Sequence, residues 1–142
     1  SIVELGVVRA VEVTTDGVRV SITPTYAGCP ALEHMRSDAS DALAAAGISA
    51  TIRTVLSPAW SSAWLSDITR EKLRAYGIAP PHVADVAQPK GLQFLPPSGF
   101  SPACPQCDSR HTERLSQFGS TACKALYRCL DCREPFDYFK PY

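Results

Sequence analysis

Two short cysteine pairs lie near the C-terminal end of the sequence. "CPQC" covers residues 104–107 and "CLDC" covers residues 129–132. A tetrahedral zinc ion takes four soft ligands, and each short pair can present two thiolates from one tight turn. A rubredoxin-like iron site or an iron–sulfur cluster is the alternative occupant. The spacing favours a structural zinc site, with the ligands Cys104, Cys107, Cys129 and Cys132.

The surroundings of these cysteines are typical of a small metal-stabilised module. Three strand-like runs, "TERLSQF", "KALYRC" and "EPFDYF", lie between and after the pairs, which predicts a three-stranded zinc ribbon. A module of about 40 residues buries too little surface to fold alone, and zinc would supply the missing stability. Four thiolates leave no open position for water, so this zinc is not expected to be hydrolytic.

A fifth cysteine, Cys29 in "TYAGCP", stands apart from the others. If a helix begins at Pro30, Cys29 is its N-cap, where the helix dipole and free N–H groups stabilise a thiolate. Serine, threonine, aspartate or asparagine would cap better, so the choice of cysteine indicates a need for sulfur. The alternative is that Cys29 only packs as a small buried residue.

The chemistry open to a single thiol is limited. A catalytic nucleophile needs a general base, and no residue near Cys29 in the sequence is an obvious candidate. An iron–sulfur cluster usually takes four protein ligands, so another chain or a small thiol would have to complete the site. Transient ligation of a cluster by Cys29 is the functional interpretation that fits one activated cysteine.

The remaining residues with ligand or partner chemistry show no such pattern. Cys123 fits neither pair and is expected to be a small residue at the start of a strand. The histidines have no ligand spacing, so we expect surface or packing roles for His34, His82 and His111. In "WSSAW", we expect one of Trp60 and Trp64 in the core and leave the other open.

The elements that must position Cys29 are predicted from hydrophobic periodicity. Runs at 7–13 and 18–25 flank the turn "TTDG" and form a β-hairpin, because their apolar residues alternate. A helix follows Pro30 and ends at Gly47, and residues 48–56 form a third strand. A second helix is expected from a cap at Ser66 to Gly77, with its apolar face formed by Ile68, Leu73 and Tyr76.

This order predicts an α+β protein: a small two-layer β-β-α-β-α domain over residues 1–79, followed by the ribbon over residues 103–142. Residues 80–102 are rich in proline and are expected to form a stiff linker. The segment "GLQFLPPSGF" is too apolar for a solvated tether, so we expect it to lie against a surface.

Charge and hydropathy bound the function. Fourteen basic residues balance fourteen acidic ones, which argues against a nucleic-acid-binding ribbon. No apolar run is long enough to span a bilayer. The sequence opens at Ser1 in mid-pattern, so we expect residues before it; with no leader pattern, we expect a cytoplasmic protein. The oligomeric state, including a homodimer, stays open.

Several longer segments of the sequence resemble a known protein family. "VSITPTYAGCPALEHM", the tryptophan segment "IRTVLSPAWSSAWLSDITREKLRAYGIAPP" and "FGSTACKALYRC" resemble the PaaD (also PaaJ) proteins of phenylacetate catabolism over nearly the whole chain. The first domain is similar to the wider iron–sulfur assembly family that includes SufT, whose T-x-x-x-C-P hallmark fits Thr25 through Pro30. The tail resembles the zinc ribbon of PaaD proteins.

The resemblance implies a non-enzymatic accessory protein. Its role would be to assist maturation of iron–sulfur or iron centres in the phenylacetyl-CoA epoxidase system, with Cys29 as the functional cysteine. The partners implied are the di-iron oxygenase or its flavin and iron–sulfur reductase, and the cofactors are structural Zn²⁺ and a transiently held iron–sulfur cluster. The alternative is a structural subunit of the epoxidase complex in which Cys29 only packs.

Overall fold

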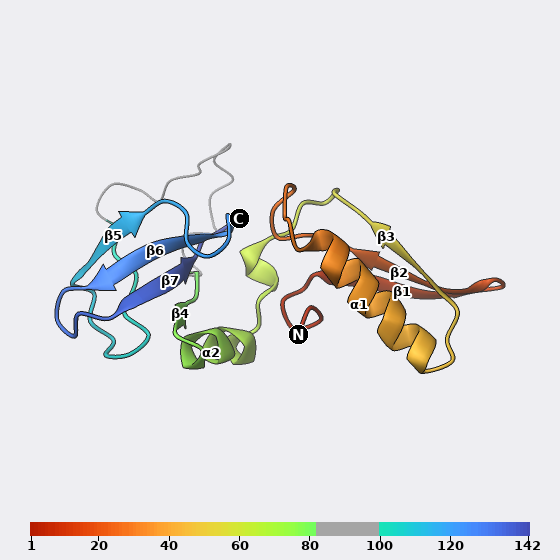
Figure 1. Cartoon of the computed structure of the whole chain (residues 1–142), viewed down its shortest axis with the longest axis horizontal. Coiled ribbons are helices and arrows are strands. Elements are labelled where there is room, and N and C mark those ends of the chain that lie inside the picture. Colours follow the sequence, from red (N-terminus) through yellow and green to blue (C-terminus); the bar gives the residue numbers. More distant parts are fainter. Residues whose placement is uncertain (82–99) are drawn as a thin grey trace. The chain divides into compact units, whose positions relative to one another are not determined.

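The computed structural model describes residues 1–81 and 100–142, and these fall into two compact units. The first unit covers residues 1–60 and the second covers residues 61–142. Each contains one sheet and one α-helix in its described part, which confirms the α+β class (Figure 1). Neither helix of the described residues is both long and apolar enough to cross a bilayer.

The first unit is a three-stranded sheet with one helix. Its elements are the strands β1 (Val8–Thr14), β2 (Gly17–Ile22) and β3 (Ala50–Thr54), and the helix α1 (Leu32–Ala45). The strand order is β1-β2-β3, with β1 and β2 antiparallel and β2 and β3 parallel. The predicted hairpin, first helix and third strand are therefore all present.

The turn of the hairpin requires glycine. Gly17 has φ +126°, and a Cβ atom added there would lie 2.5 Å from the Ser49 carbonyl oxygen. That same carbonyl accepts a hydrogen bond of 2.8 Å from the Val18 amide. A side chain at residue 17 would therefore clash where β2 meets the segment that leads into β3.

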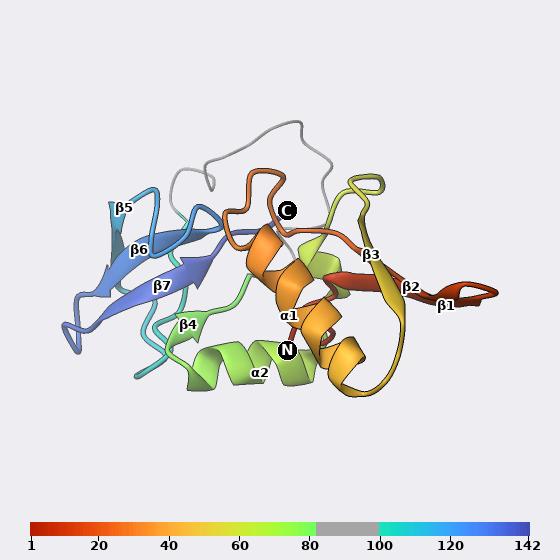
Figure 2. The same cartoon turned by 45° about the vertical axis from the view of Figure 1, so that its right-hand side comes forward.

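Helix α1 covers one face of this sheet (Figures 1 and 2). Its residues Leu32, Met35 and Leu43 follow the three-to-four spacing of an amphipathic helix and pack against a buried cluster. That cluster consists of Val7, Val20 and Ile22. Burial of these side chains is the main stabilising term available to the first unit.

Trp60, the last residue of the first unit, is part of its buried core. Its side chain is 3% exposed, and its indole Nε1–H donates a 2.8 Å hydrogen bond to the Leu5 carbonyl. This contact fixes the N-terminal segment and confirms that one tryptophan of "WSSAW" is a core residue. Trp64 lies in the short 3-10 helix η1 (Ser62–Trp64) of the second unit and is half-buried.

The second unit contains the predicted ribbon and additional elements. Its helix is α2 (Asp67–Ala75), and its sheet has the order β4-β7-β6-β5. The strands are β4 (Ile78–Ala79), β5 (Thr112–Ser116), β6 (Lys124–Cys129) and β7 (Pro135–Phe139). The three ribbon strands lie where the sequence predicts them, and their buried side chains include Tyr127, Phe136 and Tyr138.

The ribbon sheet has a fourth strand, β4, which was not predicted from the sequence. Residues 61–79 belong to the second unit, whereas the expected first domain extended to residue 79. The physical reason is backbone pairing: β4 lies parallel to β7, with Ile78 opposite Asp137. At the start of this segment, the Ser62 amide donates to the Tyr142 carbonyl at 3.0 Å. The sheet is therefore four-stranded, not three-stranded.

Two of the three residues expected on the apolar face of α2 are exposed, and only Leu73 is half-buried. Ser66 caps the helix as predicted, by accepting from the Thr69 amide at 3.2 Å, but Ile68 and Tyr76 are 65% and 84% exposed. The buried residue is Thr69, and Arg70 donates to the carbonyl oxygens of Ser62 and Pro81. Polar side chains face inward because the adjoining loops present backbone acceptors there.

Most of the proline-rich region lies outside the residues that the structure describes. Residues 82–99, which include His82 and nearly all of "GLQFLPPSGF", are not among the described residues, so the predicted linker stays a prediction. At its C-terminal edge, Phe100 packs against the ribbon core, with its ring centroid 5.2 Å from that of Tyr138.

Candidate functional site

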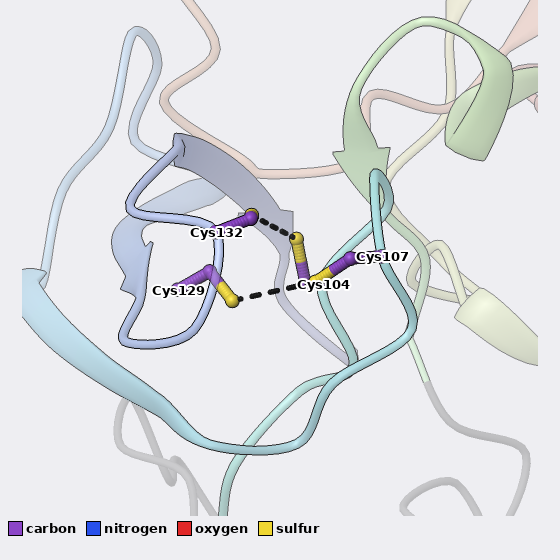
Figure 3. Close-up of side chains that lie close together, drawn as sticks. All are labelled: Cys104, Cys107, Cys129 and Cys132. Atoms are coloured by element: carbon purple, nitrogen blue, oxygen red, sulfur yellow. Dashed lines mark hydrogen bonds between the residues drawn. The ribbon is translucent and has the colours of Figure 1, made fainter.

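The structure brings the four predicted cysteines together in the second unit. Cys104 and Cys107 lie on the turn before β5, and Cys129 ends β6, with Cys132 on the turn that follows. Their sulfur atoms all lie within 4.8 Å of one another and converge on one point between the two turns (Figure 3). Within residues 1–81 and 100–142, no other such group of ligand side chains forms.

The sulfur geometry fits a tetrahedral ion. Zinc–sulfur bonds of about 2.3 Å at tetrahedral angles separate the sulfur atoms by about 3.8 Å. The distance from Cys104 Sγ to Cys132 Sγ is 3.7 Å, and that from Cys107 Sγ to Cys129 Sγ is 3.5 Å. Each pair contributes one fully buried cysteine, Cys104 or Cys129, and one exposed cysteine. The set is closed, as structural zinc sites are.

Neighbouring backbone amides and thiols shift the pKa values of these cysteines in opposite directions. The amides of Cys132 and Asp131 lower the pKa of Cys129 to about 6. The Ser109 amide also favours the Cys107 thiolate, but desolvation and the neighbouring thiols outweigh it and raise its pKa to about 12. Further thiolates in so small a space require a cation to balance their charge, so the donor set is that of a metal site.

Polar side chains connect the two cysteine turns. Ser109 Oγ donates to Asp131 Oδ2, and His111 Nδ1 lies 3.0 Å from Asp131 Oδ1. Hydrogen bonds from Ser109 and then from His111 lower the pKa of Asp131. These contacts were not predicted from the sequence. The sequence indicates them only through the position of Asp131 inside "CLDC" and of Ser109 just after "CPQC".

Helix α2 contacts the first cysteine turn. Arg74 Nη1 lies 2.6 Å from Oδ1 of Asp108, the residue that follows Cys107. Just after the helix, a Cβ atom added at Gly77 would lie 3.7 Å from the Gln106 side-chain nitrogen. Asp108 has φ +61°, a conformation that aspartate tolerates better than most residues. The segment assigned from sequence to the first domain therefore packs beside the metal site.

Cys29 lies in the first unit, in the turn that precedes α1. The helix begins at Leu32 and its N-cap is Ala31, so the expectation that Cys29 is the N-cap is wrong. The reason is an extra tight turn: the Leu32 amide donates to the Cys29 carbonyl at 3.2 Å before the helical pattern starts with Met35 to Ala31. Cys29 is half-buried.

A second turn fixes the backbone on the other side of Cys29. Its amide donates a 3.0 Å hydrogen bond to the Tyr26 carbonyl. The Tyr26 ring lies against Gly28, where an added Cβ atom would be 3.0 Å from the ring carbon Cε1. Cys29 is thus held between two turns, and among the described residues no side chain forms a hydrogen bond with its sulfur.

The other candidates lie apart from both cysteine sites. Cys123 is half-buried just before β6, and its sulfur lies 3.0 Å from Thr121 Oγ1. Its place fits the expected small residue at a strand start. His34 is exposed on α1 and belongs to no ligand group, while His111 is exposed and contacts Asp131.

Comparisons with known proteins match both parts of the chain. Residues 1–56 match the family described as iron-sulfur cluster assembly protein, and residues 98–140 match the family described as PaaD zinc beta ribbon domain. A solved structure of a domain of unknown function from Bacillus anthracis aligns with a TM-score of 0.48 and 26% identity, over 51% of this chain and 73% of that chain.

One curated relative spans both parts. This protein of Escherichia coli strain K12, named as a subunit of a "Putative 1,2-phenylacetyl-CoA epoxidase", is 46% identical over 141 residues, which are 99% of this chain and 81% of the relative. The first match contains Cys29 and the second contains all four clustered cysteines. Because it matches the PaaD zinc ribbon family and is 46% identical to this relative over 99% of its own length, the chain belongs to the PaaD family.

Proposed function

We propose that this protein is a non-catalytic accessory factor of phenylacetate catabolism that assists maturation of iron–sulfur or iron centres in the phenylacetyl-CoA epoxidase system. The observation that carries the proposal is the presence of an iron–sulfur assembly domain and a PaaD zinc ribbon in one chain. The name of the Escherichia coli relative supports the epoxidase system as the place of action.

The two cysteine sites would divide the work. Cys104, Cys107, Cys129 and Cys132 would hold a structural zinc ion, since a four-thiolate set leaves no position for substrate. The reactive thiol would then be Cys29, which is half-buried and lies outside that set. As a single thiolate it would supply one ligand to a cluster carried as cargo, with the other ligands from the client protein, a second chain or a small thiol.

A second candidate function is supported by the same relative. Because that protein is named as a subunit of the epoxidase, this chain could serve as a structural subunit in which Cys29 only packs. The match of residues 1–56, which include Cys29, to the iron-sulfur cluster assembly family favours the maturation role.

The discriminating experiment replaces Cys29 by alanine in cells that depend on phenylacetate. The variant should fold and keep its metal, because Cys29 lies in the first unit and outside the ligand set. The oxygenase and reductase purified from those cells should contain less iron or sulfide than normal. Cys123→Ala is the matched control, because Cys123 is also half-buried and outside the ligand set. Normal cofactor content with Cys29→Ala would leave the structural-subunit function.

A further inference from the structure

The polar residues beside the metal site form a connection between its two halves. Ser109 follows the first cysteine pair and Asp131 lies within the second. Ser109 Oγ donates to Asp131 Oδ2, while His111 Nδ1 lies 3.0 Å from Asp131 Oδ1. An ionised carboxylate accepts hydrogen bonds only, so the His111 Nδ1 atom carries the proton in this contact. We call these three residues the Asp131 bridge.

The bridge is tied to the ligands through the backbone of its own members. Ser109 lies two residues after the ligand Cys107, and Asp131 lies between the ligands Cys129 and Cys132. The residues whose side chains bond across the site are therefore close chain neighbours of ligands on both sides. Turning the Asp131 backbone away from Ser109 would also move the ligands next to it.

Backbone bonds hold the members of the bridge in place. The Ser109 carbonyl accepts from the Cys104 amide at 2.9 Å, and Ser109 Oγ accepts from the His111 amide at 3.0 Å. On the other side, the Leu130 amide donates to the His111 carbonyl at 2.8 Å. The backbone bonds and the side-chain contacts of the bridge therefore join the same two cysteine turns.

The arrangement does not suit hydrolysis. A nucleophilic serine must be hydrogen-bonded to the imidazole that takes its proton. Here the Ser109 hydroxyl and the His111 ring both contact the carboxylate of Asp131, and His111 reaches the serine hydroxyl only through its backbone amide. The contacts instead match the outer hydrogen bonds that orient metal ligands.

We propose that the Asp131 bridge positions the two cysteine turns for metal binding, so that its side chains set the metal affinity without being ligands. Loss of hydrogen bonds that orient metal ligands typically lowers affinity by about 10-fold to 100-fold. Asp131 accepts both side-chain contacts and is the central member, so its replacement should have the largest effect. Ser109 and His111 each supply one contact and should have smaller effects.

The test measures metal affinity of the full-length chain. Competition with a chromophoric chelator gives the zinc affinity of Asp131→Ala, Asp131→Asn and Ser109→Ala. We expect a fall of about 10-fold or more for Asp131→Ala and partial rescue in Asp131→Asn, which retains one acceptor oxygen. Cobalt-substituted variants should all keep the absorption of a tetrahedral four-thiolate site, because no ligand has changed.

A matched control and a double variant separate positioning from general destabilisation. Glu113→Gln removes another partly exposed carboxylate of the ribbon, one that pairs with Arg128 across β5 and β6, and should change zinc affinity by less than about twofold. Since Ser109 and Asp131 act through one hydrogen bond, Ser109→Ala should cost little more in an Asp131→Ala background.

Two results would overturn the proposal. One is an Asp131→Ala affinity equal to that of the Glu113→Gln control. The other is a full additional loss when Ser109→Ala is combined with Asp131→Ala. If Asp131→Ala does not fold even with excess zinc, Ser109→Ala and His111→Gln take its place, because each removes one contact. An unchanged affinity in both of these variants would equally reject the bridge.

Discussion

The two units of this protein keep cysteine in opposite surroundings. In the first unit, whose core is aliphatic, a single thiol, Cys29, lies in a turn between β2 and α1. In the second unit four thiols converge, and the Asp131 bridge joins the two turns that carry them. The first unit has an apolar core and a single thiol outside any ligand group of the described residues, whereas the second unit brings its thiols together in a metal site.

The difference indicates what each unit depends on. Helix α1 covers one face of the first sheet, so that unit has a two-layer core around Val7, Val20 and Ile22. The second unit has an aromatic cluster around Tyr127 and Tyr138, and its loops are held by polar contacts and by the cysteines. Substitutions in each unit can therefore separate apolar from metal-dependent stability.

The largest effect is expected from loss of a metal ligand. Cys129→Ser should remove most of the metal-dependent stabilisation, which is about 10–16 kcal/mol in comparable zinc peptides. Because β4 pairs with β7 and Arg74 contacts Asp108, amide protection should be lost in α2 as well as in β5–β7. Hydrogen exchange with mass spectrometry measures this. The first unit should keep its protection.

Two results would count against this view. Stoichiometric zinc retained after loss of two of the four cysteines would contradict the ligand set. Unchanged protection of α2 in Cys129→Ser would show that residues 61–79 fold without the ribbon, as the sequence analysis expected. Cys123→Ser is the control, since Cys123 is not part of the cluster.

A large-to-small substitution in the core of the first unit should destabilise that unit and leave the metal site intact. Ile22 is fully buried, and Ile22→Ala should lower the free energy of unfolding of the first unit by about 2–5 kcal/mol. Zinc content, measured by mass spectrometry of the intact protein, should not change. Val13→Ala, at a residue that is 87% exposed, should have little effect on either quantity. Zinc loss in Ile22→Ala would mean that the ribbon depends on the first unit.

A smaller effect tests the polar contacts of the second unit. A Cβ atom at Gly119 would lie 2.3 Å from Asp137 Oδ1, the carboxylate that pairs with Lys124 at 2.9 Å. Gly119→Ala should therefore cost about 1–3 kcal/mol, since one of these groups must move. Chemical denaturation with excess zinc measures the loss. In an Asp137→Ala background the same substitution should cost less, and an equal cost would exclude this clash as the cause.

The smallest effect is a pH dependence at alkaline pH. Burial raises the pKa of Tyr127 above its usual value of 10.0. The neutral phenol is favoured in the folded state, so its contribution is complete below pH 10 and is lost as the pH rises through the folded-state pKa. The urea midpoint of unfolding should therefore fall less between pH 8 and pH 11 in Tyr127→Phe than in the wild type. Tyr76→Phe, at an exposed residue, should keep the wild-type difference; an unchanged difference in Tyr127→Phe would contradict the prediction.

Local sequence signals determined the elements. Alternation of apolar residues located β1 and β2, three-to-four spacing located α1, and the spacing within each cysteine pair predicted the four-thiol cluster that the structure assembles. These features depend on neighbours in the chain, so their signals are local. The cap at Ser66 was predictable for the same reason.

Contacts between distant residues were decided only by the tertiary structure. Pairing of β4 with β7 joins residues 78–79 to a strand near the C-terminus, and no periodicity within either segment specifies that pairing. The inward face of α2 was mispredicted because the buried residue is Thr69, which bonds to the capping Ser66, while Arg70 donates to backbone carbonyls of the adjoining loops. The Asp131 bridge likewise joins residues 109 and 131, which are far apart in the sequence. The sequence by itself thus determined which residues could bind metal, and the tertiary structure decided which polar side chains hold them in place, because such hydrogen bonds require three-dimensional proximity.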